Sequence, residues 1–451
     1  MKIRLLILCS VLLFFAGGWI PGHDVFPTDP GSDNLSGAYQ PTPPPYGLPE
    51  TRLNASDYQP HDFFGYAVDI DGALLAVGAP GKNGAGHEAG GAYVFERDGQ
   101  DWVETARLVP DSLGTNDRLG MAVAVDGQIV AAGAPYATTQ EGGFAAGAVY
   151  VFRRQGNGWR EQTRLTARDG SSFDLFGSVV ALDGDMLVVG AQGVDSPLQG
   201  RNGGAAYVFQ REGEAWVEQA RLSSPDGRAD DFFGQSVAIH GEIIAVGAFG
   251  HDDPEVGPNT GAVYLFRRQD GAWFYQAKLT SAEPVPKAQF GFSLDFEGDN
   301  AEPTWLVAGA NQYASEPVDP RYDAPPGRIE LFRRQNQAWR PAAQLGPGKG
   351  NEMETSLVGA TVAMDLLRGD HFALAAGSHF GTRVHLFQGG DENWAQALAI
   401  QPEMFQLAFG RAVAISSPYL AVGSPWGAER FPDGHSERPQ TGAVFVYEVA
   451  N

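Results

Sequence analysis

The 451-residue chain has a single cysteine, Cys9, and few basic residues. One cysteine cannot build a disulfide framework or a cysteine-rich zinc site. The 31 Lys and Arg against 54 Asp and Glu give a net charge of −23, which argues against a nucleic-acid partner held through its phosphates. The sequence also lacks HExxH, P-loop, dinucleotide-binding and nucleophile-elbow patterns, so no motif points to an enzyme.

Glycine and proline are abundant instead, with 59 and 30 residues. Both residues are unfavourable inside helices, so this composition argues against a helical bundle. The hydrophobic fraction of 43%, with 11% aromatic residues, is sufficient for a large buried core.

The amino terminus has the features of a secretory signal, which we assign to residues 1–18. Lys2 and Arg4 precede an apolar stretch, and small residues follow it at 16–18. The apolar run is marginal for spanning a bilayer, so an uncleaved anchor is the alternative, and it is the only membrane contact we expect. We therefore expect a secreted or cell-envelope protein.

Residues 19–45 are rich in proline, glycine and serine and show no periodic apolar pattern. This composition predicts a disordered linker that holds the rest of the chain away from a membrane or wall. The folded domain is then residues 46–451.

Seven copies of one unit fill this domain. Each copy has an apolar residue followed by glycine, and later a second glycine before a small residue. The first landmark glycines are Gly65, Gly120, Gly177, Gly234, Gly291, Gly359 and Gly410, and the second are Gly78, Gly133, Gly190, Gly247, Gly309, Gly377 and Gly423. A third segment ends in Phe in the first six copies, and a Trp follows seven residues later.

Each unit contains four short segments of strand-forming residues bounded by turn signals. Pairs such as Asp71-Gly72 and Glu297-Gly298 join the first two segments and suit tight hairpin turns. The pattern predicts an all-β fold, a seven-bladed β-propeller with four antiparallel strands per blade.

The two ends of the domain complete the same ring. The last copy stops soon after Tyr447 and lacks its fourth strand, whereas residues 46–53 resemble a fourth strand with no blade of their own. We therefore expect the strand that ends at Leu53 to pair with the last blade, which removes an open sheet edge.

The Phe-Gly landmark, followed by Gly78-Ala79-Pro80 and Gly133-Ala134-Pro135, resembles the FG-GAP repeat. The chain is similar to secreted or envelope bacterial FG-GAP proteins over residues 46–451, and to the propeller at the amino terminus of integrin alpha subunits. The resemblance implies a seven-bladed propeller. It does not identify a ligand, because one fold supports many activities.

We expect no cofactor and no metal. Integrin propellers carry calcium loops between the first two strands of their later blades, but here that connection is usually a two-residue turn, too short to surround the ion. The longer stretch 295–300 leaves calcium as an alternative at one place. His251-Asp252-Asp253 is interpreted as a solvated loop rather than a metal site.

Two further patterns have structural interpretations. An aspartate recurs shortly before the landmark glycine in four copies, at Asp62, Asp117, Asp174 and Asp231, and we expect these side chains to cap turns. The tripeptide at 368–370, Arg-Gly-Asp, falls where the sixth copy turns between its first two strands, so we interpret it as a hairpin.

The most variable segments connect the second and third strands, at 80–90, 135–146, 192–203, 249–260, 311–326 and 425–441. In a propeller these connections emerge on one face, where binding surfaces arise. Our candidate ligand-binding residues are their aromatic side chains, Tyr136, Phe144, Tyr313, Tyr322 and Trp426. The alternative is that each aromatic ring packs against its own loop.

We thus expect a non-enzymatic binding or adhesion module that recognises a protein or a glycan. One alternative is an envelope enzyme that cleaves glycans with carboxylates near the central axis. A structural spacer without a specific ligand is the other.

Overall fold

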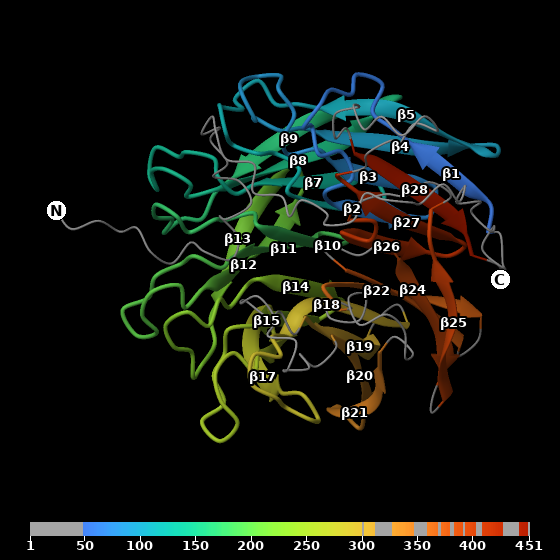
Figure 1. The fold of residues 1–451 in the computed structure, drawn as a ribbon. Helices are drawn as coiled ribbons and strands as arrows, with labels where there is room; N and C mark the ends of the chain where they lie inside the picture. The colour runs from blue at the N-terminus through green and yellow to red at the C-terminus, as the bar shows by residue number, and fades with distance from the viewer. Residues whose placement is uncertain are drawn as a thin grey trace, which may run out of the picture.

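A computed structural model describes residues 48–299, 302–311, 327–346, 359–368, 371–378, 383–390, 393–402, 408–426 and 442–449. These residues form seven four-stranded antiparallel sheets arranged around an axis (Figure 1). The predicted seven-bladed β-propeller is therefore confirmed. In the described segments no helix is long and apolar enough to cross a membrane. The signal at 1–18 and the linker at 19–45 lie outside them.

Each blade is one sheet of four strands, and the bounds in chain order are as follows. Blade 1 has β2 (Val68–Asp71), β3 (Leu74–Gly78), β4 (Ala92–Asp98) and β5 (Asp101–Leu108); blade 2 has β6 (Ala122–Asp126), β7 (Ile129–Ala134), β8 (Ala148–Gln155) and β9 (Gly158–Leu165). Blade 3 has β10 (Val179–Asp183), β11 (Met186–Ala191), β12 (Ala205–Glu212) and β13 (Ala215–Leu222); blade 4 has β14 (Ser236–His240), β15 (Ile243–Ala248), β16 (Ala262–Gln269) and β17 (Ala272–Leu279). Blade 5 has β18 (Phe290–Asp299), β19 (Glu302–Ala310), β20 (Arg328–Gln335) and β21 (Ala338–Leu345); blade 6 has β22 (Thr361–Arg368), β23 (His371–Gly377), β24 (Val384–Gly390) and β25 (Asn393–Ile400). Blade 7 has β26 (Ala412–Ser416), β27 (Tyr419–Ser424), β28 (Ala443–Glu448) and β1 (Glu50–Leu53).

The last blade joins the two ends of the folded domain, as the sequence predicted. β1 pairs antiparallel with β28, with Leu53 opposite Val444 and Glu50 opposite Tyr447. The Tyr447 hydroxyl donates a hydrogen bond to Glu50 over 2.8 Å. The first strand therefore covers the edge that β28 would otherwise expose.

Neighbouring blades approach most closely through the two landmark glycines. A Cβ atom on Gly78 would lie 1.9 Å from the carbonyl oxygen of Gly120 in the next blade. The same contact recurs at every junction, at distances up to 2.1 Å, between Gly133 and Gly177, Gly190 and Gly234, Gly247 and Gly291, Gly309 and Gly359, Gly377 and Gly410, and Gly423 and Gly65. No side chain fits there, which explains why the second landmark is always glycine.

The apolar residue before the first landmark glycine lies in the core of the six blades in which the structure describes it. Phe64 is fully buried, and its ring lies 5.5 Å from Tyr93 and 5.9 Å from Phe95, centroid to centroid. Gly65 then takes a φ of 87°, which only glycine adopts readily. The Phe-Gly pair thus fixes a buried ring and a sharp change of chain direction at adjacent residues.

The hairpins between the first two strands form a second ring of contacts. The Asp71 side chain accepts a hydrogen bond from the backbone N–H of Gly127 in the next blade, over 2.8 Å. Asp126 accepts in the same way from Gly184, and Asp183 from Gly241. The aspartates of these Asp-Gly turns therefore link blades as well as forming turns.

One predicted turn is wrong. The blade-5 hairpin does not turn at Glu297-Gly298 but continues until Asp299 pairs with Glu302, with a register shift on the way. The 295–300 stretch is therefore largely extended strand. Residues 369 and 370 of the Arg-Gly-Asp tripeptide lie outside the described residues, between the paired ends of β22 and β23.

We predict that Gly78→Ala lowers the free energy of unfolding by about 2–3 kcal/mol, because the new Cβ meets backbone atoms that cannot move aside. Gly158→Ala is the control, since a Cβ there meets nothing within 4 Å, and we expect a change within about 0.5 kcal/mol. Denaturant unfolding of both variants measures the difference. Equal effects would contradict the packing role of Gly78.

Candidate functional site

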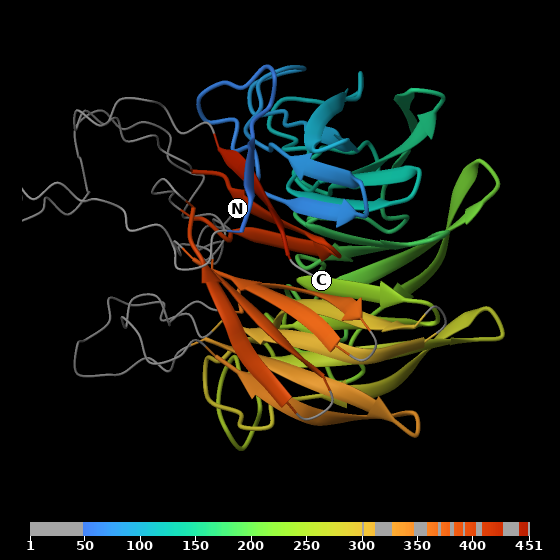
Figure 2. The same ribbon diagram turned by 90° about the vertical axis from the view of Figure 1, so that its right-hand side faces the viewer.

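One end of the ring, which we call the upper face, carries the connections between second and third strands and those leading into the next blade. Antiparallel order places both kinds of connection at the same end. In Figure 2 several hairpins between third and fourth strands project to the right, away from this face. The described connections of blades 1–4 follow β3, β7, β11 and β15, so the prediction that they share one face is confirmed for these blades.

The turn into each first strand is held by the recurring aspartate. The Asp62 carboxylate accepts a hydrogen bond from the backbone N–H of Gln59, over 2.7 Å. Asp117, Asp174 and Asp231 accept from the residue three positions earlier in the same way. The neighbours of Asp62, His61 and Phe63, both have positive φ, which is uncommon outside glycine. The predicted turn-capping role is confirmed.

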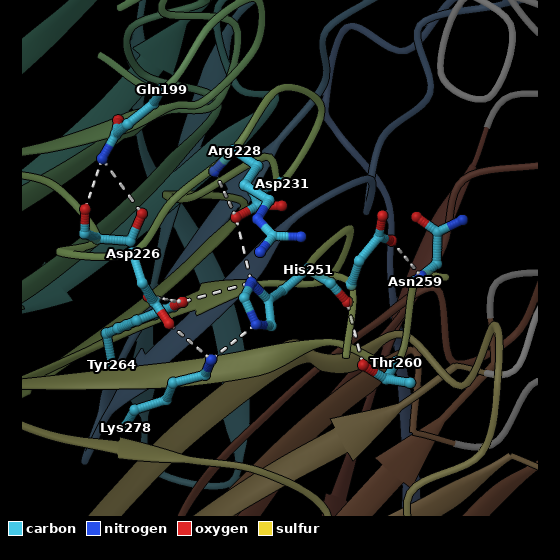
Figure 3. Close-up of polar contacts among 11 residues, drawn as sticks. Gln199, Asp226, Arg228, Asp231, His251, Asn259, Thr260, Tyr264 and Lys278 are labelled. Atoms are coloured by element: carbon cyan, nitrogen blue, oxygen red, sulfur yellow. Dashed lines mark hydrogen bonds and ion pairs between the residues drawn. The ribbon is translucent and has the colours of Figure 1, made fainter. Parts of the chain in front are cut away.

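A partly buried polar network surrounds one of these aspartates in blade 4 (Figure 3). His251 Nδ1 lies 3.2 Å from Asp231 Oδ2, and its Nε2 lies 2.7 Å from Lys278 Nζ. Lys278 also binds Asp226 over 2.9 Å, and Asp226 accepts a hydrogen bond from Tyr264 over 2.7 Å. A lysine that donates to Nε2 requires a neutral imidazole whose proton is on Nδ1, facing Asp231.

The expectation of a solvated His251 is therefore wrong, since the residue is 5% exposed. Sequence alone could not place Asp231, Lys278 and Tyr264 around it, because they come from three other segments of the blade. Asp252 and Asp253 accept hydrogen bonds from backbone N–H groups of their own loop. In the described part of the chain, no group of three His, Cys, Asp or Glu is placed to hold a metal ion.

Blade 1 repeats part of this network, whereas blade 3 has no charged residue at the position of His251. Lys82 Nζ lies 2.9 Å from Asp62 Oδ2, at the position that His251 has in blade 4. Blade 3 has Val194 there, and burial raises the pKa of Asp174 to about 6. Burial alone would also raise the pKa of Asp226, but hydrogen bonds from Lys278 and Tyr264 bring it below its ordinary value. The networks tie the loops of the upper face to the sheets below.

Aromatic side chains gather where the first strands begin and where the second strands end. We call this set the collar, and it comprises Phe63, Tyr66, Tyr136, Phe232, Phe249, Phe292 and Trp426. Phe63 lies 6.2 Å from Trp426, and Phe249 lies 5.0 Å from Phe232 and 5.5 Å from Phe292, between ring centroids. All members except Tyr66 and Phe249 are partly exposed. Two of the predicted ligand-binding residues, Tyr136 and Trp426, thus belong to one set.

The collar arises from positions that repeat along the chain. Tyr136 and Trp426 take the position that is glycine at Gly81 and Gly250. The ring of Phe63 crowds Gly81, where an added Cβ would lie 2.6 Å from it. In blade 2 the counterpart of Phe63 is Arg118, whose guanidinium lies 5.5 Å from the Tyr136 ring centroid.

A second guanidinium, that of Arg411, lies 4.3 Å from the ring centroid of Tyr66. The collar therefore combines aromatic rings with two cations, Arg411 and Arg118. Arg118 is also paired with Glu88. Aromatic and arginine side chains together are the residue types most enriched at the centres of protein interfaces.

The repeat itself matches a known family. Residues 49–95, 102–152, 159–209 and 216–266 each match the FG-GAP repeat. Each match begins in the fourth strand of one blade and ends in the third strand of the next. These four stretches of the chain are FG-GAP repeats. Each sequence repeat begins one strand earlier than a blade does. For this reason the first strand of the first repeat, β1, belongs to blade 7.

Two solved propellers resemble this FG-GAP protein in fold. "Structure of U3-55K" has a TM-score of 0.50 and 13% identity, over 89% of this chain and 98% of that chain. "Crystal structure of RRP9 WD40 repeats" has a TM-score of 0.50 and 12% identity, over 88% and 97%. At such identities the likeness extends to the fold alone. Among curated proteins, none matches the chain significantly.

Of the other predicted site residues, Phe144 lies outside the collar. Phe144 is 55% exposed and packs edge-on against Phe173, which is 44% exposed, with centroids 5.4 Å apart. Tyr313 and Tyr322 lie outside the described residues. Sequence reasoning missed Phe63, Phe232 and Phe292 because it searched only the variable loops, and it passed over Phe249 at the first position of one of those loops. Their positions next to the two landmarks were the available signal.

The first strands of the FG-GAP propeller also bring carboxylates toward the axis. Asp69 accepts a hydrogen bond from Val125 N–H in the next blade over 2.7 Å, and Asp295 accepts one from Met364 N–H over 2.8 Å. Burial raises the pKa of both to about 7. Burial, with repulsion from Asp365 and Asp295, raises the pKa of Glu297 to about 8.

Convergence of carboxylates on the axis is what the enzyme alternative requires. Asp69 and Asp295, however, each bind the open inner edge of the neighbouring first strand, where backbone N–H groups have no strand partner. We therefore assign these two carboxylates a role in joining blades.

We predict that Asp295→Asn changes the pH dependence of stability. The folded pKa of about 7 exceeds the unfolded value of about 3.9, so rising pH removes the proton from the unfolded state first and stability falls from about pH 4 to 7. Asparagine has no such proton. The variant should gain about 2 kcal/mol relative to the parent between pH 5 and 8.

Denaturant unfolding at several pH values measures this difference. Asp101→Asn, at an exposed carboxylate at the start of β5, is the control and should leave the pH profile unchanged. Parallel profiles for the parent and Asp295→Asn would contradict the raised pKa.

Proposed function

We propose that this FG-GAP propeller is an exported interaction module that binds a protein partner through the collar on its upper face. The FG-GAP propeller fold is commonly a protein-interaction module. The observation that carries the proposal is the collar itself, in which partly exposed rings and two guanidinium groups come from separate blades.

The collar suits a binding surface because its rings are held before any partner arrives. The Tyr136 ring lies against Arg118, and that of Trp426 against Phe63. The buried aspartates Asp62 and Asp117 hold the turns that carry Phe63 and Arg118, the neighbours of these rings. Side chains already fixed lose little conformational entropy on binding, which favours affinity.

The sequence supports export. Residues 1–18 have the pattern of a secretory signal, and the remainder of the chain contains no cysteine. The linker at 19–45 would let an anchored or wall-associated propeller reach partners at a distance. We propose a secreted or cell-envelope location, with an uncleaved anchor as the alternative to cleavage.

Capture of extracellular and surface proteins by the immobilised full chain tests the binding proposal. We predict that Tyr136→Ala weakens capture at least about tenfold, because aromatic residues at an interface centre carry much of the binding energy. Phe274→Ala is the matched control, since Phe274 is 53% exposed on the outer strand β17, away from the collar.

Two results would oppose the proposal: no captured protein, or equal loss in the Tyr136 and Phe274 variants. A glycan array run in parallel distinguishes a sugar ligand. If a glycan binds in a way that depends on Tyr136, and no protein partner is captured, the ligand of the collar is a carbohydrate and the proposal of a protein partner is wrong.

A further inference from the structure

Neighbouring blades meet near their lower ends through two side chains of their third strands. In the first blade of each junction, this residue directly follows the Phe that ends the third segment. In the second blade it comes two residues after the equivalent Phe. At the junction of blades 1 and 2 these residues are Glu96 and Arg154, which form an ion pair over 2.8 Å. At the junction of blades 3 and 4, Arg268 donates to Gln210 over 2.8 Å. At both junctions an arginine side chain therefore donates to an oxygen acceptor of the neighbouring blade.

Two other junctions place two arginines at these positions. Between blades 4 and 5 they are Arg267 and Arg334, and both guanidinium groups form ion pairs with the carboxylate of Glu302. Burial and the nearby Arg267 lower the pKa of Arg334. The like charges are thus joined by a carboxylate that bridges them.

Glu302 reaches this place because the blade-5 hairpin is long. β18 and β19 continue past Trp305 to the pair of Asp299 and Glu302. In blade 3 the equivalent of Trp305 is Met186, which pairs directly with Asp183 at a two-residue turn. The chain of blade 3 therefore has no residue at the position of Glu302.

Between blades 2 and 3 the two arginines are Arg153 and Arg211, and a pocket replaces the bridging carboxylate. The pocket has a volume of about 270 Å³, and both arginines line it together with Asp126, Gly184 and Asp185. The register supports the comparison, since Arg153 pairs with Ile129 as Arg267 pairs with Ile243.

The acidic residues beside the two pocket arginines do not use all of the hydrogen-bond donors of these arginines. Arg211 pairs through one terminal nitrogen with Asp185, whose side chain is 56% exposed, while its buried Nε has no hydrogen-bond partner. Arg153 pairs with Glu214, whose side chain is 78% exposed. Exposed pairs of this kind are weak and exchange readily. Asp126 is engaged by the backbone N–H of Gly184.

We propose that this lower-face pocket binds the carboxylate of an acidic side chain from a partner protein, which bridges Arg153 and Arg211 as Glu302 bridges Arg267 and Arg334. A planar carboxylate fits the guanidinium fork. Asp126 and Asp185 disfavour a doubly charged phosphate, because they add negative charge at the pocket wall. The site is separate from the collar and does not depend on the proposed function of the upper face.

Binding of short peptides to the full chain tests the proposal. The probes are a fluorescently labelled, acetylated and amidated peptide with a single Glu in an alanine background and its Gln counterpart, followed by anisotropy. The Glu peptide should bind at least about tenfold more tightly than the Gln peptide. Butyrate, a single carboxylate, should displace it at lower concentration than inorganic phosphate.

Variants locate the site. Arg211→Gln and Arg153→Gln should each weaken binding at least about tenfold, and Asp185→Asn should strengthen it because a competing carboxylate is removed. Arg154→Gln is the matched control, an equivalent arginine whose partner is Glu96, and should leave affinity unchanged. Thermal unfolding checks that the variants fold. If one of the two pocket-arginine variants does not fold, the other one alone tests the proposal.

Three results would overturn the proposal. The first is equal binding of the Glu and Gln peptides, or binding of neither. The second is an equal loss in the Arg154 and Arg211 variants, which would indicate a general charge effect. The third is stronger competition by phosphate than by butyrate. Each concerns the lower face, so none bears on the collar.

Discussion

The close approach of neighbouring blades at their landmark glycines is the constraint on which the rest of the structure depends. At all seven junctions the backbones are so near that a single Cβ would overlap a carbonyl oxygen. This contact brings the first strands together around the axis. It also places Phe63, which precedes Phe64-Gly65, beside Trp426, three residues after the second landmark of the preceding blade. This part of the collar therefore depends on the glycine contacts.

Once the ring is fixed, equivalent positions are free to differ between blades, and the differences carry the functional information. The position three residues after the second landmark is Gly81 in one blade and Tyr136 in another. A buried turn aspartate meets a lysine in blade 1 and His251 in blade 4. At the lower ends, an arginine meets an acceptor at two junctions and another arginine at two more. In a repeat protein such comparisons within one chain separate the scaffold from residues with a particular role.

Much of the architecture could be predicted from the sequence because the repeat is regular. The strands, the seven-fold count, the pairing of Leu53 with the last blade and the turn-capping aspartates all followed from spacing and turn chemistry. The predicted turn at Glu297-Gly298 was wrong. In the sequence, an X-Gly pair inside a longer hairpin looks the same as an X-Gly pair at the tip of a short one. The solvated interpretation of His251 failed for a different reason. Its partners Asp231, Tyr264 and Lys278 are local in space but not in sequence.

The sequence by itself determined the fold, since each landmark acts locally: glycine permits a positive φ or a close contact, and phenylalanine fills a core. It also placed Tyr136 and Trp426 among the candidates. Only the tertiary structure decided which side chains meet. The collar, the axial carboxylates and the Arg153–Arg211 pocket each combine residues from different blades, and such contacts depend on how sheets pack around an axis. No pattern within a single repeat encodes that packing.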